Sequence, residues 1–152
     1  MNVFELLKTD HKKVSGIFEK LDDTTERGAK SREELFTQLK QELDIHAHIE
    51  ETIFYPTIKR EAETRAITLE GYEEHAVIKT LLSELAVEPK DAEQWTAKLK
   101  VLKENVEHHV EEEEGEMFKS AREVLSTEQI NEIGARMEAE KKKQQQLKSA
   151  SA

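Results

Sequence analysis

Cysteine is absent from this chain of 152 residues. The absence excludes disulfide bonds, thiolate-ligated zinc or iron–sulfur sites and a cysteine nucleophile. No apolar run is long enough to span a membrane, and the first residues lack the apolar core of a secretory signal peptide. We therefore expect a cytoplasmic protein without a membrane partner.

Glycine and proline are also scarce, with 5 and 2 residues, and aromatic residues make up only 5% of the chain. Charged residues reach 37%, and glutamate, lysine, leucine and alanine are abundant. This combination predicts an all-α protein with charged outer helix faces. The length predicts one domain, and the net charge of −10 argues against a nucleic-acid partner.

Apolar residues recur in steps of three and four along most of the sequence, which predicts helices. The predicted helices cover about 4–21, 36–60, 71–87 and 95–117, and a further one begins at Ser126. We expect Pro56 to kink or end the second helix, although polar residues could continue it to about Arg60. The stretch Ser126-Thr127-Glu128-Gln129 has the form of a capping box.

Short connections between long helices predict antiparallel neighbours. The predicted architecture is an up-down-up-down antiparallel four-helix bundle in residues 1–124, with an additional C-terminal helix and tail in residues 125–152 of the same domain. We expect that helix to pack outside the bundle or to contact a partner, either another protein or a second copy of the chain. Residues 11–21 align with 75–85 and residues 39–55 with 102–118, so the bundle resembles two copies of one helical hairpin.

Six histidine and glutamate residues repeat in these copies: His11, His46 and Glu50 in the first, His75, His109 and Glu113 in the second. The offset is 64 residues (11 to 75) for the lone histidines and 63 (46 to 109) for the His-x-x-x-Glu pairs. One such pair is weak evidence, because a chain with 33 acidic residues contains others. All six, however, fall in the apolar stripes, where buried ionisable groups are costly unless a cation compensates them. They are the predicted metal ligands, and hydrogen-bonded His–Glu pairs in the core are the alternative.

Other polar residues near these positions are assigned less specific roles. We expect His48 to face solvent, His108 to graze the core as an outer or extra ligand, and two tyrosines, Tyr55 and Tyr72, to pack near the site. Four acidic residues of the fourth helix are interpreted as a charged outer face: Glu111, Glu112, Glu114 and Glu116.

The ligand types indicate iron or manganese, since imidazole and carboxylate occur without sulfur. Two octahedral ions need about twelve coordination positions. Four imidazoles, two bridging carboxylates and one oxo or hydroxo bridge would fill all but about two of these. The remaining positions would accept water, another side chain or an exogenous ligand, so we expect a reactive site rather than a closed structural one.

The chain resembles the haemerythrin-like family, also called the HHE cation-binding domain, over about residues 2–124. The matching stretches are Asp10-His11-Lys12-Lys13, residues 43–51 through Phe54-Tyr55-Pro56, Glu74-His75, and residues 107–114 through Met117-Phe118. The resemblance implies a four-helix bundle around two iron ions, a non-haem di-iron centre that binds dioxygen or related small ligands. It also implies that the four histidines are terminal ligands and that Glu50 and Glu113 are bridging carboxylates.

The chain departs from the oxygen-carrying members of that family at Lys79, where they place a further histidine one turn beyond the third-helix ligand. The difference disfavours simple oxygen carriage. It favours reaction with dioxygen, peroxide or nitric oxide, redox sensing, or a replacement ligand such as His108 or a tyrosine. Three alternatives stay open: a peroxidase- or catalase-like enzyme, a regulatory module whose site sets the conformation of the tail helix, and a metal-free structural bundle.

Overall fold

The computed structural model describes residues 1–151 of the chain, with side chains through residue 150, and every regular element in this range is helical. Four long helices form the body of the protein: α1 (Val3–Asp22), α2 (Ala29–Ile49), α4 (Ala62–Val87) and α5 (Glu93–Glu112). Two short helices extend α2 and α5, namely α3 (Tyr55–Lys59) and α6 (Phe118–Val124), and α7 (Thr127–Ser151) follows. A 3₁₀ turn, η1 (Glu26–Gly28), lies between α1 and α2.

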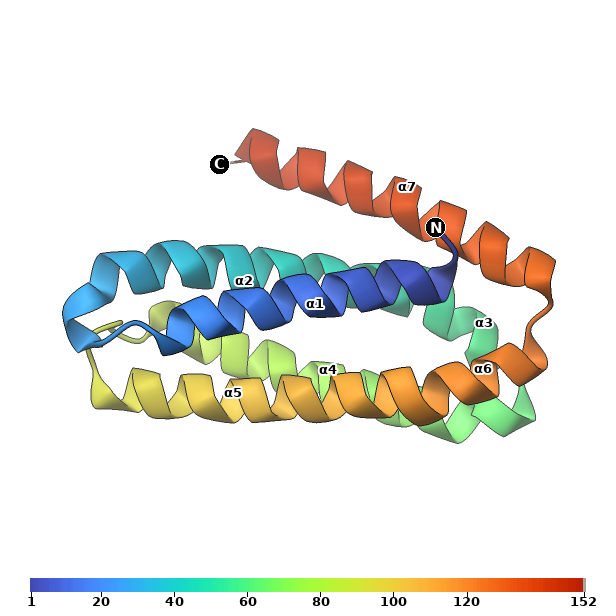
Figure 1. Cartoon of the computed structure of the whole chain (residues 1–152), viewed down its shortest axis with the longest axis horizontal. Coiled ribbons are helices and arrows are strands. Elements are labelled where there is room, and N and C mark those ends of the chain that lie inside the picture. The colour runs from blue at the N-terminus through green and yellow to red at the C-terminus, as the bar shows by residue number, and fades with distance from the viewer. Residues whose placement is uncertain (152) are drawn as a thin grey trace.

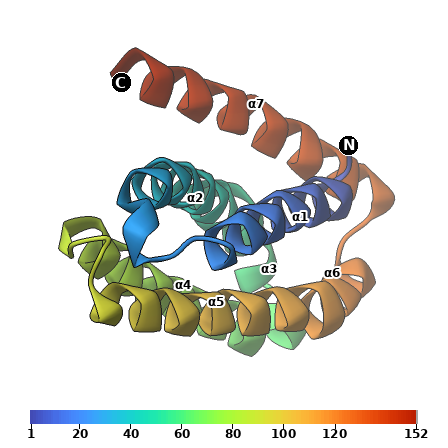
Figure 2. The ribbon, with the colours of Figure 1, turned by 60° about the vertical axis from the view of Figure 1, so that its left-hand side comes forward.

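The four long helices lie side by side, and consecutive helices run in opposite directions (Figure 1). Helix α7 packs on the outside of the bundle against α1 and α2 and diverges from them toward its C-terminal end (Figures 1 and 2). None of the helices in the described range is long and apolar enough to cross a membrane. The predicted antiparallel four-helix bundle with an additional C-terminal helix is confirmed.

Local side-chain hydrogen bonds define where the first and last helices begin. Asn2 Oδ1 accepts the backbone N–H of Glu5 at 2.9 Å, which is the bond expected of an N-cap. Before α7, the backbone N–H of Gln129 donates to Ser126 Oγ at 3.1 Å, and the N–H of Ser126 donates to Gln129 Oε1 at 2.9 Å. This reciprocal pair confirms the predicted capping box.

Two π-helical turns interrupt the bundle helices at equivalent positions of the two hairpins. One, η2 (Glu50–Phe54), joins α2 to α3, and the other, η3 (Glu113–Met117), joins α5 to α6. Pro56 lies in the first turn of α3, and the helix continues past it to Lys59. The wider turn before Pro56 has already shifted the backbone hydrogen bonds, so the missing N–H does not end the helix there. The helix therefore ends at Lys59, next to Arg60, which is about the last position to which the sequence predicts that polar residues could continue it.

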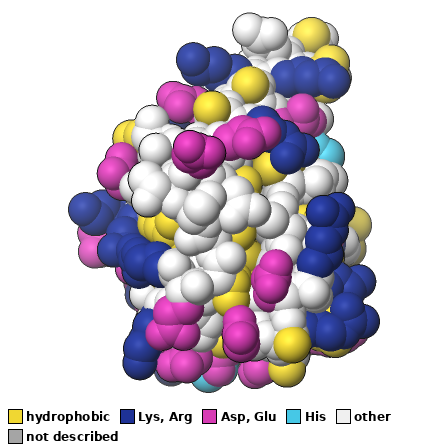
Figure 3. All heavy atoms as spheres, turned by 90° about the vertical axis from the view of Figure 1, so that its right-hand side faces the viewer, with side chains coloured by type: hydrophobic (Ala, Val, Ile, Leu, Met, Phe, Trp, Pro, Cys, Tyr) yellow, Lys and Arg dark blue, Asp and Glu magenta, His cyan; other side chains and the backbone are white. Residues whose placement is uncertain are grey.

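The buried apolar side chains form two clusters, separated along each bundle helix by the predicted ligands. One cluster includes Phe4, Phe54 and Phe118, and the other includes Phe36 and Trp95. At the end of the bundle that contains α3 and α6, the surface mixes acidic and basic side chains, as the composition predicts (Figure 3). The ionisable ligands thus lie in a polar layer between two apolar regions, where water cannot easily solvate them.

Candidate metal centre

The structure brings the six predicted ligands together in the middle of the bundle. Each bundle helix supplies one histidine, and each π-turn begins with one of the two glutamates: His11 from α1, His46 from α2, His75 from α4, His109 from α5, Glu50 from η2 and Glu113 from η3. All six side chains are buried, with relative exposures from 0% to 7%. The histidines point inward because each belongs to the apolar face of its own helix.

Glu113 lies between the two halves of the cluster. Its Oε1 is 3.0 Å from His11 Nε2 and 3.8 Å from His46 Nε2, whereas its Oε2 is 3.3 Å from His109 Nε2. Among the buried side chains of the described residues, two sets are close enough to hold a metal ion, and both include this residue: His11, His46 and Glu113, and Glu50, His75, His109 and Glu113. One oxygen toward each set is the arrangement that a bridging carboxylate requires.

Glu50 lies opposite, also between two imidazoles. Its Oε1 is 3.1 Å from His46 Nε2 and 3.1 Å from His75 Nε2. Among the described residues, neither oxygen of Glu50 has a hydrogen-bond partner of suitable geometry, and His46 Nε2 has none either. A fully buried carboxylate without such partners is costly to fold, and a cation offsets that cost. The residues present therefore fit a metal site.

Each of the four imidazoles uses its other nitrogen to contact an outer carboxylate. The Nδ1–H groups donate as follows: His11 to Glu114 at 2.6 Å, His46 to Asp10 at 2.9 Å, His75 to Glu51 at 2.8 Å and His109 to Glu74 at 2.5 Å. These bonds fix the tautomer in which Nδ1 holds the proton and Nε2 faces the centre. All four Nε2 atoms are thereby presented as ligands.

The interpretation of Glu114 as part of a charged outer face is wrong, because this side chain binds His11. Asp10, Glu51 and Glu74 received no role from the sequence. The repeat was the available signal, since the outer carboxylates share the ligand offsets, 64 residues between Asp10 and Glu74 and 63 between Glu51 and Glu114. Because the chain contains 33 acidic residues, no single one of these carboxylates is distinctive in the sequence.

Tyr55 adds a hydroxyl group to the buried centre. Its Oη donates to Glu113 Oε2 at 2.6 Å and lies 3.4 Å from Nε2 of both His75 and His109. Gly71 on α4 leaves room for it, because an added Cβ there would lie 3.1 Å from Tyr55 Oη. The expectation that Tyr55 packs near the site is confirmed. Its equivalent in the second hairpin is Phe118, so the hydroxyl breaks the symmetry of the repeat.

Three other sequence candidates lie outside the ligand cluster. His108 is 65% exposed, with Nε2 3.2 Å from Glu112 Oε1, so the prediction that it grazes the core is wrong. The reason is that α7 packs on the first hairpin and has no equivalent on the second. His48 lies partly exposed, with Nε2 3.0 Å from Glu140 Oε1 of α7. Lys79 is exposed and donates to Glu51 Oε1 at 3.2 Å.

Charge at the centre is balanced by protons when no metal is bound. Burial disfavours a charged imidazole, but Glu113 and Glu74 outweigh it and raise the pKa of His109 to about 10. The pKa of His46 is likewise raised well above its usual value, because Glu50 and Asp10 outweigh burial. Burial also opposes ionisation of Glu113, yet Glu50 and the surrounding imidazoles hold its pKa well below the usual range. Metal ions and protons therefore compete for this site.

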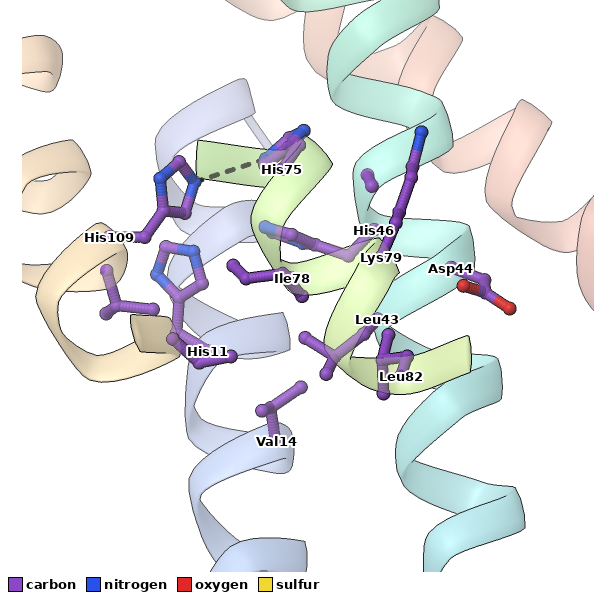
Figure 4. Close-up of a pocket in the computed structure, with 13 residues that line it drawn as sticks. His11, Val14, Leu43, Asp44, His46, His75, Ile78, Lys79, Leu82 and His109 are labelled. Carbon is purple, nitrogen blue, oxygen red and sulfur yellow. Dashed lines mark hydrogen bonds between the residues drawn. The ribbon is translucent and has the colours of Figure 1, made fainter. Parts of the chain in front are cut away.

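A cavity of about 30 Å³ adjoins the four imidazoles (Figure 4). Its remaining walls are mainly aliphatic side chains: Val14, Leu43, Ala47, Ile78, Leu82, Val106 and Val110. In Figure 4 the imidazoles lie on one side of the group, and Val14, Leu43 and Leu82 lie on the other. One water molecule needs a cavity of about 10–15 Å³, so this space suits a diatomic molecule or a similarly small ligand.

Comparisons with known proteins agree with this geometry. Residues 2–121 match the family model described as Hemerythrin HHE cation binding domain. The uncharacterized protein Rv2633c of Mycobacterium tuberculosis is 29% identical over 140 residues, which cover 91% of this chain and 84% of that protein. A DNA nickase of Nostoc sp. is 30% identical over 146 residues, which cover 96% of this chain but 41% of that protein.

A solved structure is similar along almost the whole chain. It is the crystal structure of a Hemerythrin HHE cation binding domain-containing protein of Mycobacterium kansasii, a Rv2633c homologue. It shares 28% sequence identity and a TM-score of 0.82, over 95% of this chain and 87% of that one. With a family model that matches most of the sequence, this fold and the buried His/Glu cluster, the chain belongs to the hemerythrin HHE cation-binding domain family.

Proposed function

We propose that the protein is a non-haem di-iron protein that binds dioxygen, peroxide or nitric oxide and reacts with it at the buried centre. The main support is that two ligand sets share Glu113 and adjoin an aliphatic cavity of about 30 Å³. Imidazole and carboxylate ligands without sulfur suit iron, with manganese as the nearest alternative. We propose the six buried residues as ligands, His11, His46, Glu50, His75, His109 and Glu113.

The protein side chains have separable roles in this proposal. Four imidazoles would bind the metal through Nε2, held in orientation by the outer carboxylates, while Glu50 and Glu113 would each contact both ions. The aliphatic walls would admit small ligands and exclude larger ones, which limits competing reactions. When bound, the iron pair would supply the exchange of electrons with the small ligand.

Metal analysis of freshly purified protein, paired with absorption spectra, tests this proposal. We expect about two irons per chain and charge-transfer absorption that changes when azide or peroxide is added. Substitution of an outlying histidine, His48→Ala, is the matched control and should leave both results unchanged. Protein that contains no iron, or a single zinc ion, would contradict the proposal.

We propose Tyr55 as the replacement for the histidine that is absent at Lys79. The Tyr55 hydroxyl already lies among the ligand atoms, whereas His108 lies on the surface. Burial and the charge of Glu113 raise the pKa of Tyr55 well above its usual value, and a cation in that place would reverse the effect.

Tyr55→Phe should therefore abolish a phenolate-to-iron absorption band of the ferric protein while the iron content stays close to that of the wild type. Tyr72→Phe is the control, since the Tyr72 hydroxyl donates to the backbone oxygen of Glu51 instead. Identical visible spectra for Tyr55→Phe and the wild type would show that Tyr55 does not bind iron and only donates a hydrogen bond to Glu113.

The cavity beside the imidazoles also allows a second function, peroxidase- or catalase-like turnover at the same centre. Steady consumption of peroxide that is lost in His109→Ala would support this enzyme activity. A stoichiometric loss of colour without turnover would favour ligand binding or sensing. A metal-free structural bundle instead predicts no change in stability after treatment with a chelator.

The name of the Nostoc relative gives no direct support for DNA cleavage by this chain. The chain spans less than half of that protein's length, and its net charge of −10 would repel a phosphate backbone. We therefore propose no nucleic-acid partner. Contact with another protein or a second copy through α7 stays a prediction, as does a cytoplasmic location.

A further inference from the structure

The two halves of the centre differ in the surroundings of their outer carboxylates. Asp10 and Glu74 occupy equivalent positions of the repeat, and each accepts an Nδ1–H, from His46 and His109 respectively. The Asp10 side chain is 3% exposed, and Lys141 of α7 donates to its second oxygen. The Glu74 side chain is 21% exposed, and no lysine contacts it in the described part of the chain. Helix α7 therefore reaches only one half of the centre.

Packing of the α7 residues that precede Lys141 determines where its ammonium group lies. One turn earlier, Met137 is fully buried in the same cluster as Val3 and Phe4. Further back, the backbone of α7 is pressed against the start of α1, since a Cβ added at Gly134 would lie 2.5 Å from the backbone oxygen of Met1. The neighbouring Glu140 contacts His48 of α2 at 3.0 Å. Lys141 thus contacts Asp10 from a helix that is packed on the bundle rather than from a free tail.

Lys141 satisfies an oxygen that would otherwise be buried without a partner. A buried carboxylate that loses a charged donor must find water or move, and either change would disturb its bond to His46. His46 would then be less firmly held with Nε2 toward Glu50 and Glu113. Loss of such an outer partner typically weakens metal binding about 10–100-fold.

We propose that Lys141 is a positioning residue through which α7 sets the metal affinity of the half-site that contains His11 and His46. The inference rests on the metal site proposed above and adds to it a link to the C-terminal helix. Linkage makes the effect reciprocal: metal at this half-site must favour docked α7 by the same factor by which docking favours metal. The other half-site, which lacks a lysine from α7, should be insensitive to the same substitution.

Titration of the metal-free protein with Co²⁺ or Fe²⁺ tests the proposal. Lys141→Met should weaken one of the two binding steps by about 10–100-fold and leave the other unchanged. Lys141→Arg, which keeps the charge, should restore most of the affinity. Lys142→Met, which alters the exposed neighbour, should bind metal as the wild type does. If Lys141→Met loses α7 helicity, Lys141→Gln replaces it.

Hydrogen exchange of the α7 amides provides the second measurement. In the wild type, metal should slow exchange around residues 137–144 by about the same 10–100-fold factor, and Lys141→Met should abolish the slowing. Equal weakening of both metal steps, or unchanged binding in a folded Lys141→Met protein, would overturn the proposal. Wild-type protein that binds no metal would instead overturn the proposed function itself, and with it this inference.

Discussion

Replacement of Glu113 by alanine should weaken binding of both metal ions by more than about 100-fold, beyond the range seen when only an outer partner is lost. Glu113 directs one oxygen toward His11 and the other toward His109, and it belongs to both ligand sets. Its removal also leaves several buried imidazoles without the carboxylate that balances them. The change should be visible as loss of both metals in elemental analysis and in titrations of the metal-free protein.

Two further variants sharpen this expectation. Glu116→Ala changes an exposed glutamate of the same π-turn and should retain both ions. Glu50→Ala should also weaken binding of both ions, because Glu50 Oε1 lies 3.1 Å from Nε2 of both His46 and His75. Circular dichroism distinguishes these effects from unfolding. Retention of one tightly bound ion by folded Glu113→Ala protein would contradict a bridging role for Glu113.

Much of the fold could be predicted because its determinants are local. The spacing of apolar residues defines the long helices, and Ser126 with Gln129 defines the start of α7 through bonds that span only three residues. The six central residues could also be predicted, since burial of repeated ionisable groups requires compensation. These inferences need only the identity of the residues and their spacing along the sequence.

The π-turns at Glu50 and Glu113 could not be predicted in the same way. A π-turn depends on which backbone carbonyl each N–H selects, and side-chain periodicity does not record that choice. The outer carboxylates were missed for a different reason. Asp10 and Glu114 acquire their roles by contact with histidines of other helices, 36 and 103 residues away. The exposure of His108 similarly depends on α7, which covers only one hairpin.

Raising the pH should destabilise the metal-free protein, and bound metal should largely suppress this effect. His109 has a pKa of about 10 in the folded protein against an ordinary value of 6.5. Between these values the folded state binds more protons than the unfolded state, so stability falls as pH rises. The contribution of His109 is complete below pH 6.5 and is lost as pH rises through about 10. It amounts to at most roughly 5 kcal/mol, and the raised pKa values of His46 and His75 act in the same direction.

Urea denaturation of chelator-treated and metal-loaded protein from pH 7 to 9.5 measures both trends. The metal-free midpoint should decrease steadily, and His109→Gln should reduce the slope because it removes one of the titrating groups. The loaded protein should change less, since metal has already displaced the Nε2 protons and its imidazoles are neutral throughout this range. At acidic pH the direction of the effect reverses. The pKa of Glu113 is held low in the folded protein, so the stability that this carboxylate contributes is lost as pH falls. A metal-free protein whose stability is constant or increases between pH 7 and 9.5 would show that protons do not replace the metal charge at this centre.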